Sequence, residues 1–298
     1  MLKRSVFLGS LAALGAAATL PALAAPTSQL KVRWYGGGVY ELATPDDSAI
    51  VLLDAWIWNN TGFKQFNLDK PAELASPDAY IAYLKARNPK NIVVALTHDH
   101  GDHSGDFIEL LKAMTAANMP VSVVGQGDLM RVGFIPKFKD AGLDESKLVV
   151  NGGNGINFGG VATVGSVKLH LVPAVHSNGM PFPAAGFIVD IAGTRVYASG
   201  DTDVFGDMSL IGKRYSPALA VVCAGGGPFT MDVQGAAEAV HMIGAHAALP
   251  VHYGHNPLVG GTDTGERFRA AMGRVDVSVA VTVLKPGERV TLTLPSIS

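Results

Sequence analysis

The chain has 298 residues, of which 48% are hydrophobic and 16% charged, with 35 Gly and a single Cys. Average soluble domains have about 25% charged residues and about 7% Gly, so this sequence is apolar and glycine-rich. Long disorder is excluded because it requires low hydrophobicity and high net charge, and one Cys excludes a disulfide scaffold within the chain. The formal net charge of −2 provides no general positive field, so no nucleic-acid partner is expected.

Residues 1–24 differ in composition from the rest of the chain. Lys3 and Arg4 precede a nearly uncharged stretch rich in Leu and Ala, which ends in an Ala-Leu-Ala triplet at 22–24. This layout is typical of a secretory signal peptide cleaved after Ala24. The alternative is an amphipathic or membrane-spanning first helix, but the apolar run is shorter than the roughly 20 residues that span a bilayer. The sequence therefore predicts an exported protein, periplasmic or secreted, without stable membrane insertion after processing, and residues 25–298 as a single domain.

The first half of this domain reads as strands followed by helices. Apolar β-type runs predict strands, and Ser76 followed by Pro77 is typical of a helix start. The strand expected at 91–97 is continuously apolar, as in an interior strand with both faces buried. Residues 125–160 are rich in Gly and Asn and are expected to hold short helices and a hairpin. The other expected strands are 31–35, 39–43, 49–54 and 121–124, and the expected helices are 77–87 and 104–117.

The second half alternates more regularly between the two kinds of element. The expected helices are 205–213, 233–243 and 264–271, and the expected strands are 167–173, 186–191, 195–198, 219–223, 247–251, 277–283 and 289–294. No short-period repeat or linker-like tract interrupts this order. A sheet-on-sheet core with helices on both outer faces would satisfy it.

Three His and two Asp occur within six residues directly after the strand at 91–97: His98, Asp99, His100, Asp102 and His103. At alternate positions of an extended loop, His98 and His100 can point to one side and bind one metal ion. Asp102 and His103 would then lie at the start of the next helix and can face a second ion. Imidazole and carboxylate suit zinc and its first-row neighbours. Because closed structural zinc sites normally use several Cys, we expect this site to keep an open position for water.

Three more candidate ligands stand where strands are expected to end, namely His176, Asp201 and His252. Taken singly, each would more often be a structural or surface residue. Together with the cluster at 98–103 they indicate a metal site, because ligands at one end of a sheet share a pocket. His255 and Asn256 follow directly and are candidates for binding substrate or donating a proton, with solvated loop residues as the equal alternative.

The chain resembles the metallo-β-lactamase superfamily in its H-x-H-x-D-H motif at 98–103, followed in the family's order by His176, Asp201 and His252. Residues 200–202, 225–231 and 250–253 are similar to the branch of metal-dependent hydrolases that includes ascorbate-6-phosphate lactonase. The chain departs from that branch in its Gly-Gly-Gly turn at 36–38 and in having Asp54-Ala55 where members tend to have Asp-Pro. These departures concern the substrate more than the metals.

The resemblance implies an α/β fold, the four-layer αββα sandwich of the metallo-β-lactamase type, with the site at one edge of the two sheets. It implies two divalent metal ions, zinc being expected and manganese or iron the alternatives. One ion would be held by His98, His100 and His176. The other would be held by Asp102, His103 and His252, with Asp201 bridging the two.

Two carboxylates, Asp102 and Asp54, are expected to serve catalysis. Asp102 would do so as a metal ligand. Asp54 matches the acidic residue that begins the family's series of motifs and would orient a ligand or the water.

We therefore expect a dinuclear metal-dependent hydrolase in which a metal-bridging hydroxide cleaves a small-molecule ester, lactone, amide or phosphoester. The chain has no G-x-S-x-G elbow, and this chemistry needs no Ser or Cys nucleophile. One alternative is a non-catalytic metal-binding protein of the same fold. Another is an iron-dependent oxidoreductase, whose relatives generally carry Glu where this chain has His100. β-Lactam hydrolysis is less favoured because Asp201 stands where one major lactamase class has Cys. The substrate, the native metal and the oligomeric state stay open.

Several other residues belong to types that often act in catalysis or binding, but packing within the fold is the preferred explanation for them. Trp56 and Trp58 are expected near the pocket mouth, with ordinary loop packing as the alternative to a contact with substrate. Cys223 lies in an apolar run and is expected to be a buried small residue, with a catalytic thiol as the alternative. The histidines expected to be structural are His170, His241 and His246.

Overall fold

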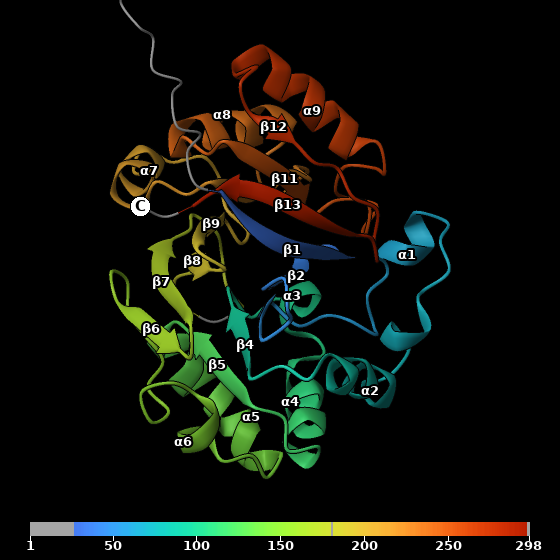
Figure 1. Cartoon of the computed structure of the whole chain (residues 1–298), viewed down its shortest axis with the longest axis vertical. Coiled ribbons are helices and arrows are strands. Elements are labelled where there is room, and N and C mark those ends of the chain that lie inside the picture. Colours follow the sequence, from blue (N-terminus) through green and yellow to red (C-terminus); the bar gives the residue numbers. More distant parts are fainter. Residues whose placement is uncertain (1–26, 180, 297–298) are drawn as a thin grey trace, which may run out of the picture.

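Two β-sheets lie face to face between two layers of helices (Figure 1). The computed structural model describes residues 27–179 and 181–296, so the expected signal peptide lies outside the described residues. The first sheet has the strand order β13 (Arg289–Pro295), β1 (Thr27–Gly36), β2 (Val39–Ala43), β3 (Ala49–Leu53), β4 (Asn91–Leu96) and β5 (Val121–Gly125). The second has the order β12 (Ala280–Val281), β11 (Ala247–Val251), β10 (Leu219–Cys223), β9 (Thr194–Ala198), β8 (Ala185–Ile191), β7 (Val167–Pro173) and β6 (Val161–Val164).

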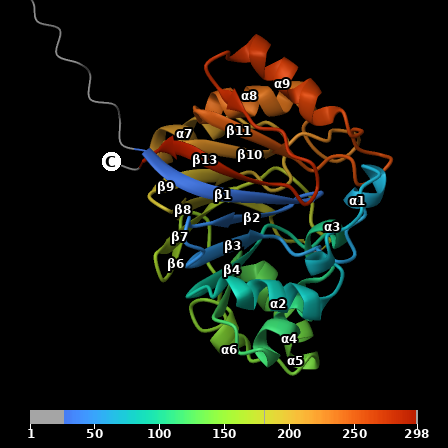
Figure 2. The same cartoon turned by 45° about the vertical axis from the view of Figure 1, so that its right-hand side comes forward.

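Helices cover the outer face of each sheet (Figure 2). The first sheet is covered by α2 (Pro77–Arg87), α4 (Phe107–Ala116), α5 (Ile135–Asp140) and α6 (Glu145–Leu148). The second is covered by α7 (Met208–Tyr215), α8 (Val233–Ile243) and α9 (Thr264–Val275). Shorter pieces lie in the connections: α1 (Gly62–Gln65), η1 (Ala72–Leu74), α3 (Gly101–Ser104) and the π-helical turn η2 (Leu129–Phe134).

The buried apolar side chains form three layers, one between the sheets and one beneath each set of helices. Leu53 and Val93 point into the layer between the sheets, whereas their neighbours Leu52 and Val94 point toward the helices. Alternate residues of a strand face opposite sides, so a strand buried on both sides must be continuously apolar. The four-layer αββα sandwich expected from the sequence is confirmed.

The strands that carry the candidate ligands all end at the same edge of the sandwich. Strands β3, β4 and β5 pair in parallel, and so do β9, β10, β11 and β12. Strand β7 is antiparallel to β8, and β8 is antiparallel to β9, so β7 runs in the same direction as β9. Polar residues placed just after these strands are therefore brought together at one edge, as in other parallel sheets that bind ligands at their carboxyl ends.

The helix expected at 104–117 is interrupted. It forms as α3 and α4, with Gly105 and Asp106 between them. The Asp106 carboxylate accepts hydrogen bonds from the backbone N–H of Ile57 and of Asn59. A Cβ at Gly105 would lie close to the carbonyl oxygen of Gly101. Contacts with the segment that follows β3 thus override the local helical pattern.

Two other expectations are corrected. The apolar run at 277–283 forms a strand only at Ala280–Val281, which pairs with β11 alone, and Val277 is 87% exposed. The hairpin expected within 125–160 does not form there, because this stretch contains η2, α5 and α6. The hairpin lies just beyond it and joins β6 to β7.

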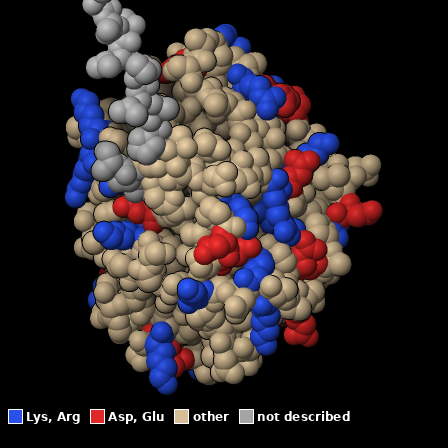
Figure 3. Space-filling model, in the orientation of Figure 1, with Lys and Arg blue, Asp and Glu red and all other residues tan. Residues whose placement is uncertain are grey.

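Charged side chains of both signs are interspersed on the face of the molecule that carries β1 and β13 (Figure 3). Opposite charges are also paired beneath the surface of the first sheet, where Arg33 lies 2.8 Å from Glu73 and Arg87 lies 2.9 Å from Asp47. This face therefore presents no large surface of a single sign.

Candidate metal centre

The candidate ligands leave the two sheets from the ends of four strands. His98 follows β4, and His100, Asp102 and His103 continue from it into α3. The other three follow strands of the second sheet, His176 after β7, Asp201 after β9 and His252 after β11. All seven predicted ligands thus belong to one cluster of side chains between the edges of the sheets.

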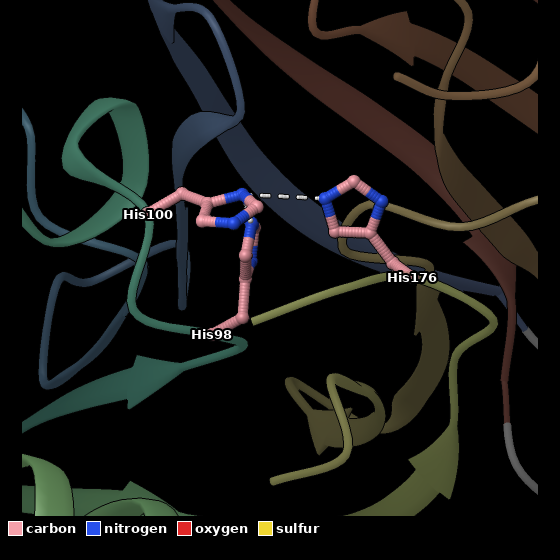
Figure 4. Close-up of side chains that lie close together, drawn as sticks. All are labelled: His98, His100 and His176. Atoms are coloured by element: carbon pink, nitrogen blue, oxygen red, sulfur yellow. Dashed lines mark hydrogen bonds between the residues drawn. The ribbon is translucent and has the colours of Figure 1, made fainter. Parts of the chain in front are cut away.

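Three imidazoles form the first group within this cluster. His98 and His100 come from the loop after β4 and His176 comes from the loop after β7, and their rings converge (Figure 4). Nε2 of His98 lies 3.1 Å from Nδ1 of His100, which in turn lies 3.3 Å from Nε2 of His176. Three nitrogens this close together suit a single cation between them.

Asp201 connects this first group to a second one. Its Oδ2 lies 3.0 Å from Nε2 of His252 and 3.4 Å from Nε2 of His103. The same oxygen is 3.7 Å from Nε2 of His176 and 4.0 Å from Nε2 of His98. One buried carboxylate oxygen therefore faces imidazoles of both groups, which is the position that a bridging ligand requires.

Asp102 completes the second group from α3. Its Oδ2 lies 3.4 Å from Nε2 of His252 and 3.3 Å from Nε2 of His255. His255 is buried, whereas the sequence predicted a residue that binds substrate or donates a proton, or a solvated loop residue. The structure brings it into the same group of potential ligands as Asp102 and His252.

Asp54 was predicted to orient a ligand, and it contacts His103 directly and His98 through Thr97. Its Oδ2 accepts hydrogen bonds from Nδ1–H of His103 at 2.6 Å and from Oγ1–H of Thr97 at 2.7 Å. Because the Thr97 hydroxyl hydrogen is used on Asp54, its oxygen is left to accept from Nδ1–H of His98 at 3.0 Å. Asp54 thereby holds the hydrogen on Nδ1 of both imidazoles and leaves their Nε2 atoms for a metal.

The backbone at two of these positions is in the left-handed region. Asp54 has φ of 62° and His252 has φ of 61°. Non-glycine residues are uncommon there, although Asp and His are among the more tolerant, and such conformations concentrate at functional sites. Here they turn the chain sharply at the ends of β3 and β11.

The charges in the cluster favour ionised carboxylates. Burial would raise the pKa of Asp201, but His252 and His103 outweigh it and hold the pKa well below its ordinary value. Burial likewise opposes ionisation of Asp102, whose pKa is nevertheless lowered by the neighbouring imidazoles of His252 and His255. Carboxylates that stay ionised are ready to bind a cation.

Two imidazoles of the cluster have a lowered pKa and two have a raised pKa. Burial lowers the pKa of His98 well below its ordinary value, and burial also lowers the pKa of His176. At His103 and His252, burial acts in the same direction, but carboxylates led by Asp201 outweigh it, raising the pKa of His103 well above its ordinary value and that of His252 to about 9. Without a metal these two imidazoles hold protons beside Asp201, and metal uptake would displace those protons.

The residues fit a metal centre because several buried polar atoms in the cluster have no hydrogen-bond partner within the described residues. They are Nε2 of His103, Oδ1 of Asp201, both ring nitrogens of His252 and Nδ1 of His255. Buried polar atoms are nearly always hydrogen-bonded, and a group of orphans around one point indicates a missing ion or water. Nitrogen and oxygen donors are the set that zinc and its neighbours bind.

A cavity of about 490 Å³ opens onto the cluster. Besides candidate ligands and His255, it is lined by Trp56, Thr61, Phe229 and Asn256. None of its lining residues is Lys or Arg. Thr61 was not identified from the sequence, and Phe229 was noted only within the segment 225–231 that resembles a branch of metal-dependent hydrolases, since both lie on loops far from the motif along the chain.

The remaining candidates lie elsewhere. The indole N–H of Trp58 donates to Glu109, and the exposed side chain of His241 lies 3.2 Å from Asp276. His170 contacts Asp190 at 3.9 Å, and His246 is exposed. Cys223 is buried, and burial raises the pKa of its thiol to about 12, so it stays protonated. These residues are outside the cavity, as expected for structural positions.

Residues 52–253 match the family model described as the beta-lactamase superfamily domain. The chain therefore belongs to the beta-lactamase superfamily, and its fold is the one of that class. Within the superfamily it belongs with the UPF0173 metal-dependent hydrolases and is a metal-dependent hydrolase.

Two curated relatives support this placement. The UPF0173 metal-dependent hydrolase of Archaeoglobus fulgidus is 32% identical over 271 residues, which is 87% of this chain and 97% of the relative. That of Chloroflexus aurantiacus is 34% identical over 266 residues, which is 86% of this chain and 95% of the relative. Among solved structures, Igni18, a metallo hydrolase from Ignicoccus hospitalis, superposes with a TM-score of 0.68 at 24% identity, covering 89% of this chain and 99% of its own, and supports the fold.

The comparisons correct one expectation. Nothing in them indicates a signal peptide: the two relatives align over nearly their whole length with only 87% and 86% of this chain. The sequence pattern at 1–24 therefore gains no support from the family, and the signal peptide, with the periplasmic or secreted location inferred from it, is not assigned. Within the described part of the chain, no helix has the length and apolar character that crossing a membrane requires.

Proposed function

We propose that this hydrolase holds two divalent metal ions, zinc being the first candidate, and cleaves a small neutral ester, lactone or amide. One ion would be held by His98, His100 and His176, and the other by Asp102, His103 and His252. The observation that carries the proposal is the position of Asp201, whose Oδ2 faces imidazoles of both groups within 4.0 Å. Such a carboxylate would bridge the two ions.

The metals and the protein residues would contribute different parts of the chemistry. When bound, divalent ions would lower the pKa of a water to about 7 and polarise the carbonyl oxygen of the substrate. Asp54 holds His103 and, through Thr97, His98 in the tautomers that present Nε2. Burial around His98 and Asp201 keeps bulk water away and strengthens the interactions among these groups.

The cavity walls favour a neutral substrate. Trp56 and Phe229 offer aromatic surface, and Thr61 and Asn256 offer uncharged hydrogen-bonding groups. Phosphate and carboxylate groups are usually recognised by Arg or Lys, and neither lines the cavity. Lys64 and Lys70 line a neighbouring depression instead, which shares only Thr61 with the cavity. A carbonyl substrate therefore fits better than a phosphoester.

The test is a comparison of hydrolysis rates with metal-loaded protein. Neutral nitrophenyl esters and simple lactones should be cleaved with a kcat/KM at least about 100-fold higher than nitrophenyl phosphate or its diester. Asp201→Asn should abolish both metal uptake and hydrolysis, whereas Asp203→Asn, an exposed carboxylate two residues away, should preserve both. A preference for the phosphoesters would contradict the substrate class, and full activity of Asp201→Asn would contradict the metal centre.

A further inference from the structure

We infer that His255 is an additional ligand of the second metal ion, beside Asp102 and His252. The inference rests on the two-metal site proposed above and adds to it an imidazole outside the motif residues. It concerns a position at which neither the H-x-H-x-D-H motif nor the strand ends predicted a ligand.

The first reason is the convergence of atoms on Asp102. Nε2 of His255 lies 3.3 Å and Nε2 of His252 lies 3.4 Å from the same carboxylate oxygen, Oδ2. All three ligand atoms lie within 4.8 Å of one another. Neighbouring ligand atoms bonded to one zinc ion at 2.0–2.2 Å are about 3.0–3.5 Å apart, whether four or more ligands surround the ion. The observed separations therefore match those of atoms that share an ion.

The second reason is the hydrogen-bond balance of the His255 ring. The side chain is 2% exposed, and Nδ1 is buried without a partner within the described residues. Because Nδ1 has no partner among the described residues in either neutral tautomer, the two roles, hydrogen-bond donor to Asp102 and metal ligand, differ only at Nε2, which faces Asp102. With the hydrogen on Nδ1, the lone pairs of Nε2 and Asp102 face each other, and a cation between them removes their repulsion.

The third reason is that the surroundings hold His255 in this position. The hydroxyl of Thr61 donates to the backbone carbonyl of His255 at 2.6 Å, and the Trp56 ring meets the imidazole edge to face, with centroids 5.9 Å apart. Gly37 lies opposite, where an added Cβ would be 3.2 Å from Trp56 and 3.7 Å from His255. The glycine turn at 36–38 thus provides the space that the indole and the imidazole occupy.

The experiment counts the imidazoles that bind metal in the cobalt-substituted protein. An imidazole bound to Co²⁺ shows one exchangeable ring N–H signal shifted far outside the ordinary proton range by the unpaired electrons. We expect six such signals in the wild type, from His98, His100, His103, His176, His252 and His255. His255→Ala and His255→Gln should each lose one signal, and His246→Ala, which removes an exposed histidine, should keep all six.

The possible results separate this inference from the proposal on which it rests. Five shifted signals in the wild type and the same five in both His255 variants would overturn the role of His255 while leaving the two-metal site intact. Only three signals in the wild type would contradict the second ion itself. The glutamine variant keeps a polar side chain of similar length, and its circular dichroism spectrum identifies any loss of signals that is due to unfolding.

Discussion

At the scale of single residues, the metal centre depends on a few buried polar atoms and on the hydrogen that each one carries. Asp54 is the central case, because its carboxylate contacts His103 directly and His98 through Thr97. A metal-ligating imidazole is usually oriented by a partner on its other nitrogen. Here one carboxylate does so for a ligand in each group.

Asp54→Asn should lower metal affinity about 10- to 100-fold and reduce hydrolysis accordingly. The side-chain amide would place an N–H₂ group against the Nδ1–H of His103, which would shift the ring hydrogen to Nε2 and remove the lone pair that binds metal. Competition with a chromogenic chelator measures the affinity, with Asp203→Asn as the control. Unchanged affinity in Asp54→Asn would show that the carboxylate does not set the tautomers.

The sequence identified much of the site at this scale and missed the rest for a physical reason. The motif at 98–103 stands out because three imidazoles follow one apolar strand, and His176, Asp201 and His252 follow other strand ends. Thr97 and Thr61 carry no such pattern. Their roles arise from contacts with residues distant in sequence, such as His255 against Thr61, which only the folded chain brings together.

At the scale of elements, the strand ends and tight turns place the ligands. The turn at 36–38, between β1 and β2, lies against the second metal group: the carbonyl of Gly37 accepts from the backbone N–H of His252, and a Cβ at Gly38 would lie 2.2 Å from Cε1 of His103. Position 38 therefore requires glycine because the His103 ring lies too close to leave room for a side chain.

Gly38→Ala should displace His103 and destabilise the protein by about 1–3 kcal/mol, as overpacking of a buried position does. Metal affinity should fall with it. The control is Gly273→Ala in α9, where an added Cβ meets nothing within 4 Å and where Ala is the better helix former. Thermal unfolding measures both variants, and a Gly38→Ala protein with wild-type stability and metal binding would contradict the packing described.

A second prediction for elements concerns the ion pairs between α2 and the turn that joins β2 to β3. Asp47 lies 2.9 Å from Arg87 and 3.1 Å from Lys31. Burial would raise the pKa of Asp47, but Arg87 and Lys31 outweigh it and lower the pKa. The stability from this carboxylate is therefore present above its unfolded pKa, near 3.9, and is lost as the pH falls through the folded value.

Asp47→Asn should consequently destabilise the protein by about 1 kcal/mol or less at pH 7, and the difference from the wild type should vanish toward pH 2. Asn also tolerates the left-handed backbone of this position, where φ is 59°, so the change isolates the charge. Urea unfolding at pH 7, 5, 3 and 2 measures the difference, with Asp69→Asn as an exposed control. A difference that stays constant with pH would exclude the ion pairs as its origin.

Local sequence patterns were sufficient to predict the buried strands but not every helix boundary. Strands such as β4 and β10 were predicted because burial on both faces demands unbroken apolar runs. The break between α3 and α4 was not predicted, since it depends on Asp106 bonding to the backbone of Ile57 and Asn59. The hydrophobic periodicity of a segment contains no information about a hydrogen-bond partner some 50 residues away.

At the scale of the whole molecule, the sandwich brings residues from opposite ends of the chain to one edge. Asp54 follows the first sheet's β3, and His252 follows the second sheet's β11. Metal binding therefore links the two halves of the fold. A ligand that binds only the folded state stabilises it, by about 2.7 kcal/mol at a free concentration of 100 times its Kd.

The two-metal centre is tested most directly by the return of hydrolytic activity when zinc is titrated into chelator-treated protein. Hydrolysis of a neutral lactone should be absent after chelation and should rise until two equivalents of metal are bound per chain. The melting temperature should rise over the same range of added metal. Lactone hydrolysis that survives chelation, or that is complete at one equivalent, would contradict the two-metal centre.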